Sequence, residues 1–129
     1  MKNKLEIKEL TKAEEEIMQN LWFLQKAFIK DILEKLPEPK PAYNTVSTIV
    51  RILETKGFVS HESLGNSHRY YPLIDKDTYK SFATKKLISS YFDNSAQNML
   101  SFFLEKEKLD INEVDEILKI IEQAKKEIK

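Results

Sequence analysis

Residues 41–57 read PAYNTVSTIVRILETKG, and this stretch decides how the rest of the chain can fold. At 3.6 residues per turn its apolar side chains fall on one face of a helix, which is the pattern of a buried stripe. These apolar side chains are Val46, Ile49, Val50 and Leu53. Pro41 stands where the helix is expected to begin and Gly57 just past its end, the usual positions of these residues at helix termini. The stretch therefore predicts a helix with one face packed against a core.

The opposite face of this helix is polar but carries a single charge. Its side chains are Asn44, Ser47, Thr48, Arg51 and Thr55. An ordinary solvated face carries Glu and Lys, whereas short hydrogen-bonding side chains can lie close against a surface of donors and acceptors, such as the major groove of DNA. Two interpretations are open at this point: a helix that reads DNA, or a core helix whose exposed side is made of small residues.

The composition is that of a globular protein, with 41% hydrophobic and 33% charged residues among 129. The sequence has no cysteine, which excludes disulfides and thiolate metal sites. No apolar run approaches the roughly 20 residues needed to span a bilayer. Residues 1–10 also lack the apolar region of a secretory signal. We therefore expect a cytoplasmic protein without membrane insertion.

The net charge is zero, with 21 basic and 21 acidic residues, whereas many nucleic-acid-binding domains are strongly basic. Both histidines lie within residues 40–73, the region that holds the predicted helix and the segment after it. Any attraction to phosphate must therefore come from local placement of charge, and dimerisation would double it.

Two further helices are expected before residue 41. Thr11 and Glu14 have the spacing of a capping box, which opens a helix over residues 12–24. Glu14 and the two glutamates after it fit the first turn, where the helix dipole favours anions, and no other role is expected for them. A second helix is expected over residues 29–36, and the prolines that follow it hold the connector extended.

After residue 57 the pattern changes to β-prone residues on either side of Gly65-Asn66, which is typical of a type II′ hairpin turn. A two-residue loop places Glu62 opposite Arg69 and His61 opposite Tyr70. Arg69 then has two interpretations, because it can pair with Glu62 across the strands or contact a phosphate.

Three helices followed by a hairpin are the order of a winged helix-turn-helix domain. In such a domain the third helix is the recognition helix and the hairpin is the wing. Winged-helix domains also occur as protein-interaction modules, so the order of elements leaves the function open.

Residues 75–129 are expected to form three more helices, with a break at residues 93–95 and a capping box at Asp110 and Glu113. Three short helices this rich in aromatic residues make a poor core for one chain, so we expect them to interleave with a second copy. The predicted fold is mainly α (α+β), with a winged helix-turn-helix domain over 1–74 and a three-helix dimerisation domain over 75–129.

The segment AYNTVSTIVRILETKGFV, followed by RYYPLI, resembles the penicillinase-repressor (BlaI/MecI) family of transcriptional repressors. LTKAEEEIMQNLW is similar to the first helix of that family, and KSFATKKLISSYF with SFFLEKEKLDINEVDEIL resembles its dimerisation domain. The resemblance implies a homodimer that binds a palindromic operator on double-stranded DNA. In the best-known members, which control antibiotic resistance, a membrane metalloprotease sensor triggers cleavage of the dimerisation domain and relieves repression.

The resemblance also implies roles for particular residues. The recognition helix would contact DNA through Tyr43, Asn44, Thr45, Ser47, Thr48 and Arg51, and the wing would contact the backbone through His68 and Arg69. The dimerisation positions would include Tyr91, Leu100, Phe102, Phe103, Ile117 and Ile121. The Asn-Phe bond cleaved in the resistance repressors corresponds here to Ser101-Phe102, where the phenylalanine is retained and the asparagine is replaced.

No catalytic or metal-binding arrangement is apparent in the sequence. His61 and His68 are two imidazoles without a cysteine or a carboxylate cluster, which is a weak basis for zinc, so we expect no metal and no cofactor. No Ser-His-Asp, P-loop or paired-acid arrangement is present, and we expect no enzyme. The alternative to a DNA-binding repressor is a winged-helix adaptor that binds protein and not DNA.

Overall fold

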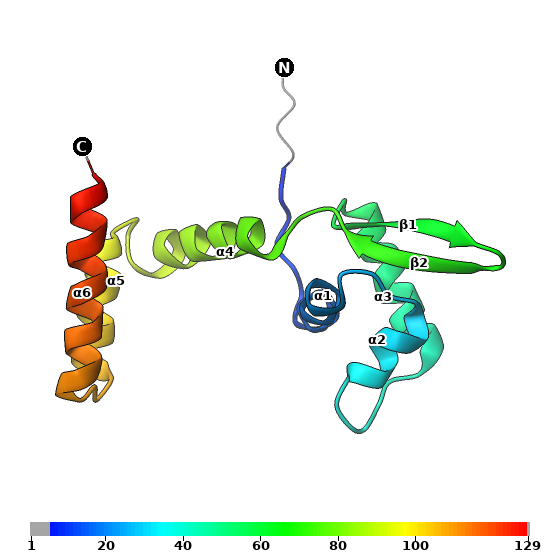
Figure 1. Ribbon diagram of the computed structural model, residues 1–129, viewed down its shortest axis with the longest axis horizontal. Coiled ribbons are helices and arrows are strands. Elements are labelled where there is room, and N and C mark those ends of the chain that lie inside the picture. The colour runs from blue at the N-terminus through cyan, green and yellow to red at the C-terminus, as the bar shows by residue number, and fades with distance from the viewer. Residues whose placement is uncertain (1–5, 129) are drawn as a thin grey trace, which may run out of the picture. The chain divides into compact units, whose positions relative to one another are not determined.

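The computed structural model describes residues 6–128, which contain six helices and one β-hairpin (Figure 1). In chain order the elements are α1 (Lys12–Leu24), α2 (Ile29–Lys35), α3 (Tyr43–Thr55), β1 (Val59–Leu64), β2 (Ser67–Pro72), α4 (Lys76–Tyr91), α5 (Ala96–Lys106) and α6 (Ile111–Glu127). The predicted fold class, a mainly helical chain with three helices, a hairpin and three further helices, is confirmed. Within the same residues, no helix is both long enough and apolar enough to cross a membrane.

The chain divides into two compact units, Met1–Thr84 and Lys85–Lys129, and the division falls inside α4. The first turns of α4 therefore belong to the unit that holds the hairpin. The boundary expected between residues 74 and 75 is of another kind, because it divides the chain by function into a DNA-binding part and a dimerisation part. That functional boundary stays a prediction.

The core of the first unit lies among α1, α2, α3 and the start of the hairpin. Its largest fully buried side chains are Met18, Leu21, Ile32, Val46, Val50, Leu53, Phe58 and Val59. The three from α3 are spaced at i, i+4 and i+7, the predicted stripe, and Ile49 packs partly buried beside them. Burial of this stripe turns the opposite face of α3 outward.

The ends of α1 and α3 follow from local hydrogen bonding. α1 begins at the predicted capping box, in which the Glu14 N–H donates to Thr11 Oγ1 (3.2 Å) and the Thr11 N–H donates to Glu14 Oε1 (2.9 Å). α3 starts later than predicted, because Ala42 is its N-cap and Pro41 belongs to the connector. Gly57 follows the end of α3 with φ +86°, a conformation that favours glycine.

The hairpin has the predicted register, with Glu62 opposite Arg69. Of the two turn residues only Gly65 has a positive φ (+63°), as a type II′ turn requires. A bridge that the sequence did not indicate joins Ala27 to Tyr70, whose N–H and C=O groups exchange hydrogen bonds of 2.9 and 2.8 Å. This bridge fixes the α1–α2 connector against the wing.

The second unit contains α5, α6 and the end of α4. α4 stops at the predicted break, where Asp93 and Asn94 have positive φ, and α6 starts at the predicted capping box of Asp110 and Glu113. None of residues 85–128 is buried. The exposed large apolar side chains of α4, α5 and α6 are Leu87, Tyr91, Phe102, Phe103, Leu104, Ile111, Leu118, Ile120 and Ile121.

Candidate nucleic-acid interface

The polar face of α3 is open to solvent. Its exposed residues are Tyr43, Asn44, Thr45, Thr48 and Arg51. Ser47 lies on the same face and is half-buried. Within residues 6–128 the Arg51 guanidinium makes no hydrogen bond and no ion pair. Its charge is therefore available to an external anion, while the backbone C=O of Arg51 accepts a hydrogen bond from the Thr55 hydroxyl (3.1 Å).

An open cleft of about 440 Å³ lies between α3 and the tip of the wing. Its lining residues are Phe28, Ile29, Lys30, Tyr43, Ser47, Arg51, Asn66, Ser67, His68 and Tyr70. The structure thus brings three of the predicted recognition-helix residues together with one predicted wing residue. The other predicted DNA-contacting residues, Asn44, Thr45, Thr48 and Arg69, are not among those that line the cleft.

Lys30 is a candidate that the sequence reasoning missed. It is exposed in the first turn of α2 and lines the same cleft as Arg51. Across the described part of the chain its ammonium group forms no hydrogen bond or ion pair. A lysine near a helix start is common on protein surfaces, so only the packing of α2 beside α3 reveals that it adds a second free cation to the cleft. Such a pair is suited to neutralising backbone phosphates.

Arg69 is engaged within the wing. Its Nε donates to Glu62 Oε2 (2.8 Å), and the Lys26 ammonium lies 3.4 Å from the same oxygen. The hydrogen bond from Arg69 is the main reason that the pKa of Glu62 lies below its ordinary value. The predicted cross-strand pair is therefore present, and a phosphate contact by Arg69 stays a prediction.

The two histidines stack on one face of the hairpin. The ring centroids of His61 and His68 are 4.1 Å apart with an angle of 12° between the rings. His61 Nδ1 also lies 2.8 Å from Glu54 Oε2, and the Tyr70 ring is 5.4 Å from the His61 ring. No group of three or more His, Asp or Glu residues that could hold a metal ion occurs within residues 6–128.

Two kinds of comparison with known proteins agree with this architecture. The family model described as "Penicillinase repressor" matches residues 10–123. The methicillin resistance regulatory protein MecI of Staphylococcus aureus (strain N315) is 26% identical over 114 residues, which cover 88% of this chain and 93% of that protein. The penicillinase repressor of Bacillus licheniformis is 24% identical over 120 residues, which cover 92% of this chain and 94% of that protein.

The match to the family model extends from the first helix to the last, and it includes α3 with its exposed polar face, the wing and the cleft between them. The chain therefore belongs to the penicillinase repressor family, whose members are DNA-binding transcriptional repressors and not enzymes.

Proposed function

We propose that this protein is a cytoplasmic, homodimeric repressor that binds a palindromic operator, with the exposed face of α3 in the major groove. The observation that carries this proposal is the cleft in which Arg51, Lys30 and His68 are presented together. Residues that flank a recognition helix contact the phosphate backbone and fix the helix in register, and residues on the helix then read the bases.

The roles proposed along α3 follow from side-chain chemistry. Arg51 can donate two hydrogen bonds to a guanine, which is the commonest specific contact in the major groove. Asn44, Thr45, Ser47 and Thr48 offer short donors and acceptors that let the helix approach base edges. Tyr43, at the start of α3 and exposed, is proposed to contact the backbone.

Homodimerisation is proposed from the second unit taken by itself. Large apolar side chains stay exposed there, among them Tyr91 at 77% and Phe102 at 50%. The other proposed interface residues are Leu100, Phe103, Ile117 and Ile121. Monomeric proteins rarely leave so much apolar surface uncovered, and a second copy related by a two-fold axis would cover it. The same axis would place two α3 helices over half-sites about 34–36 Å apart, or a multiple of that spacing.

Relief of repression is proposed to come from a membrane metalloprotease sensor that acts upstream and leads to cleavage at Ser101-Phe102. Both residues are exposed on α5. Support for this pathway comes from the relatives, which are named for methicillin resistance and for penicillinase repression. Cleavage inside α5 would remove the second half of the proposed dimer interface.

The test compares binding of the full chain to the region upstream of its own operon with binding to a scrambled duplex of equal length and composition. We expect preference for the native duplex, a dimer on it, and an association constant that falls with salt by about 0.9 log units per log unit for each neutralised phosphate. Equal affinity for the two duplexes, or no binding by a folded protein, would favour the winged-helix adaptor instead.

A further inference from the structure

Three side chains, Glu54, His61 and His68, contact one another in a row from the end of α3 to the wing side of the cleft. The Glu54 carboxylate, near the end of α3, meets His61 Nδ1 at 2.8 Å. A carboxylate accepts hydrogen bonds, so Nδ1 of His61 carries the proton of this bond. The His61 ring also stacks on the His68 ring, with 4.1 Å between the ring centroids. His68 is exposed and lines the cleft, so the row ends where a ligand of the cleft would lie.

These two histidines are the only ones in the sequence, and the sequence has no cysteine. Histidine is the side chain that ordinarily gains or loses its charge between pH 5 and 8. Side-chain proton exchange near neutral pH is therefore concentrated on the wing, beside the proposed DNA-binding cleft.

The groups around His68 determine when it accepts a proton. The titratable or charged residues that face the two rings are Lys30 from α2, Tyr43, Arg51 and Glu54 from α3, and Tyr70 from β2. In the free protein the Glu54 carboxylate is bonded to His61 rather than to His68, and the cations Lys30 and Arg51 line the same cleft as His68. A phosphate that enters the cleft brings a negative charge close to His68, and this charge favours the protonated imidazole.

We propose that DNA binding by this protein is coupled to proton uptake, with His68 as the proton acceptor and the Glu54–His61 pair as the positioning group that holds it. This inference rests on the proposed function. His61 acts through His68: its ring supports the His68 ring from one side, and the bond to Glu54 fixes the His61 ring in turn. The protonated His68 then donates to a phosphate oxygen, and affinity rises as pH falls.

The experiment measures the Kd of the full-length protein for a fluorescent duplex from its own upstream region, between pH 6 and pH 8 at fixed ionic strength. One proton taken up on binding changes an equilibrium constant by at most about tenfold per pH unit, so we expect Kd to rise roughly fivefold or more across this range. Sedimentation at each pH verifies that the association state of the protein is constant.

Variants test whether His68 is the residue that takes up the proton on DNA binding. His68→Gln is expected to flatten the profile and to leave Kd near the value that the wild type has at pH 8. His61→Phe keeps a ring for the stack and is expected to keep the profile, whereas His61→Ala is expected to reduce it. Thr48→Ala is the matched control, since this uncharged residue outside the cleft should weaken binding by the same factor at every pH.

Each result separates this inference from the function on which it rests. Tight binding with a flat wild-type profile overturns the proton coupling and leaves the repressor intact. A profile that persists in His68→Gln, or that disappears in His61→Phe, overturns the assignment to His68. Failure to bind any duplex at any pH overturns the proposed function, and this inference with it.

Discussion

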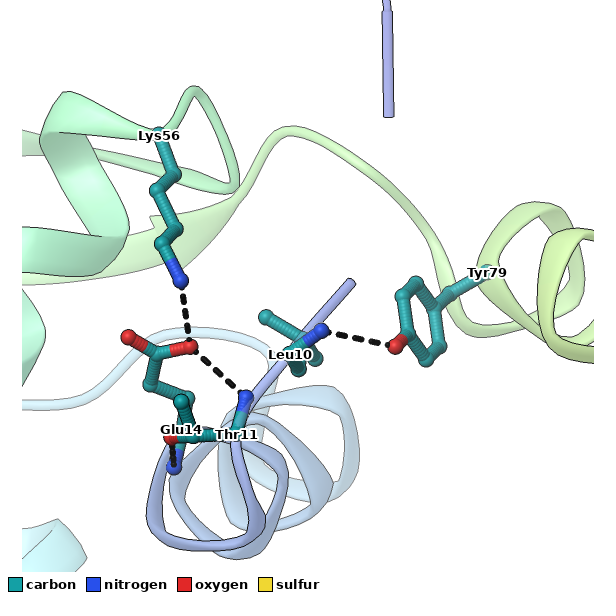
Figure 2. Close-up of polar contacts among 5 residues, drawn as sticks. All are labelled: Leu10, Thr11, Glu14, Lys56 and Tyr79. Atoms are coloured by element: carbon teal, nitrogen blue, oxygen red, sulfur yellow. Dashed lines mark hydrogen bonds and ion pairs between the residues drawn. The ribbon is translucent and has the colours of Figure 1, made fainter. Parts of the chain in front are cut away.

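The Glu14 carboxylate, in the first turn of α1, lies 2.7 Å from the ammonium of Lys56 at the end of α3 (Figure 2). Glu14 is only 5% exposed, and its Oε1 also accepts the Thr11 N–H. Burial raises the pKa of Glu14, but the hydrogen bonds from Lys56 and Thr11, together with the Lys56 charge, outweigh it, and the net shift is downward. One carboxylate therefore caps α1 and fixes it to the end of α3.

Replacement of this carboxylate should make stability less sensitive to acid. Because the folded-state pKa of Glu14 is below its ordinary 4.5, the pair stabilises the fold above that pH and ceases to do so as pH falls through the folded value. Glu14→Gln should therefore lower the free energy of unfolding by about 1–3 kcal/mol near neutral pH, with a smaller loss in acid. Urea unfolding at one protein concentration, at about pH 7 and about pH 4, measures both.

The matched control is Glu15→Gln, which removes a neighbouring exposed glutamate from the same turn. It should change stability little at either pH. A loss in Glu14→Gln that has the same size at both pH values would show that the charge of the pair does not carry its stability.

The second contact in Figure 2 allows the contribution of the Tyr79 hydroxyl to the free energy of unfolding to be measured. The Leu10 N–H donates to Tyr79 Oη (3.0 Å), and burial raises the pKa of Tyr79, so the group stays neutral. Tyr79→Phe keeps the ring against Trp22 and Phe58 but leaves the buried Leu10 N–H without its partner. We expect a loss of about 1–3 kcal/mol in thermal or urea unfolding. Tyr43→Phe, at a 53% exposed site outside the proposed dimer interface, should leave the free energy of unfolding unchanged, and equal effects of the two variants would refute the role of this bond.

These contacts show why part of the structure could not be predicted from the sequence. The capping boxes, the buried stripe of α3 and the hairpin register depend on residues close together in the chain, so spacing alone predicts them. The Glu14–Lys56 pair and the Leu10–Tyr79 bond join residues 42 and 69 positions apart. Such contacts follow from how whole elements pack, and the sequence therefore suggested only local roles for Glu14, in the capping box and beside the helix dipole.

The same division applies to the candidate site. The outward face of α3 could be predicted, because the buried stripe fixes which side chains point away. The cleft could not, since it depends on α2 and the wing lying on either side of α3, and Lys30 was missed for that reason. Pro41 also misled slightly, because a proline can precede a helix start as well as occupy it.

Removal of the free guanidinium in the cleft should weaken operator binding without unfolding the protein. Arg51 is exposed and its side chain makes no hydrogen bond or ion pair within residues 6–128, so its loss leaves no buried group unsatisfied. Arg51→Ala should cost about 1–3 kcal/mol of binding to the native duplex, and Thr48→Ala a similar amount if it reads a base. Thr84→Ala, the same truncation on α4, is the control. Wild-type binding that both α3 variants retain in full would rule out α3 as the reading helix.

Removal of the Glu62 carboxylate should have the opposite effect on DNA affinity. Glu62 engages both Arg69 and Lys26, and its lowered pKa keeps it charged at neutral pH. Glu62→Gln releases one cation on the wing, Arg69, and one on the α1–α2 connector, Lys26, so we expect tighter binding to scrambled as well as native duplex. The salt dependence should steepen by up to about 0.9 per cation that meets a phosphate. Glu16→Gln, which removes an exposed charge from α1, is the control, and an unchanged salt slope in Glu62→Gln would show that the freed cations do not reach DNA.

A charge on the apolar face of α5 should separate the proposed dimer. Phe102 is 50% exposed, and its ring lies 5.6 Å from that of Phe92 within the second unit. Phe102→Asp would bury a carboxylate without a partner if a second copy covers this face, and such burial costs several kcal/mol. Sedimentation velocity should then find monomers at concentrations where the wild type is dimeric.

Phe23→Asp is the matched control for this variant, because Phe23 is 74% exposed on α1 in the first unit and receives the same substitution. It should remain dimeric. Because two half-sites are read together, Phe102→Asp should also lose affinity for the full palindrome while it keeps its affinity for a single half-site. A dimer that survives Phe102→Asp with its helical circular dichroism unchanged would place the interface on another surface of the chain.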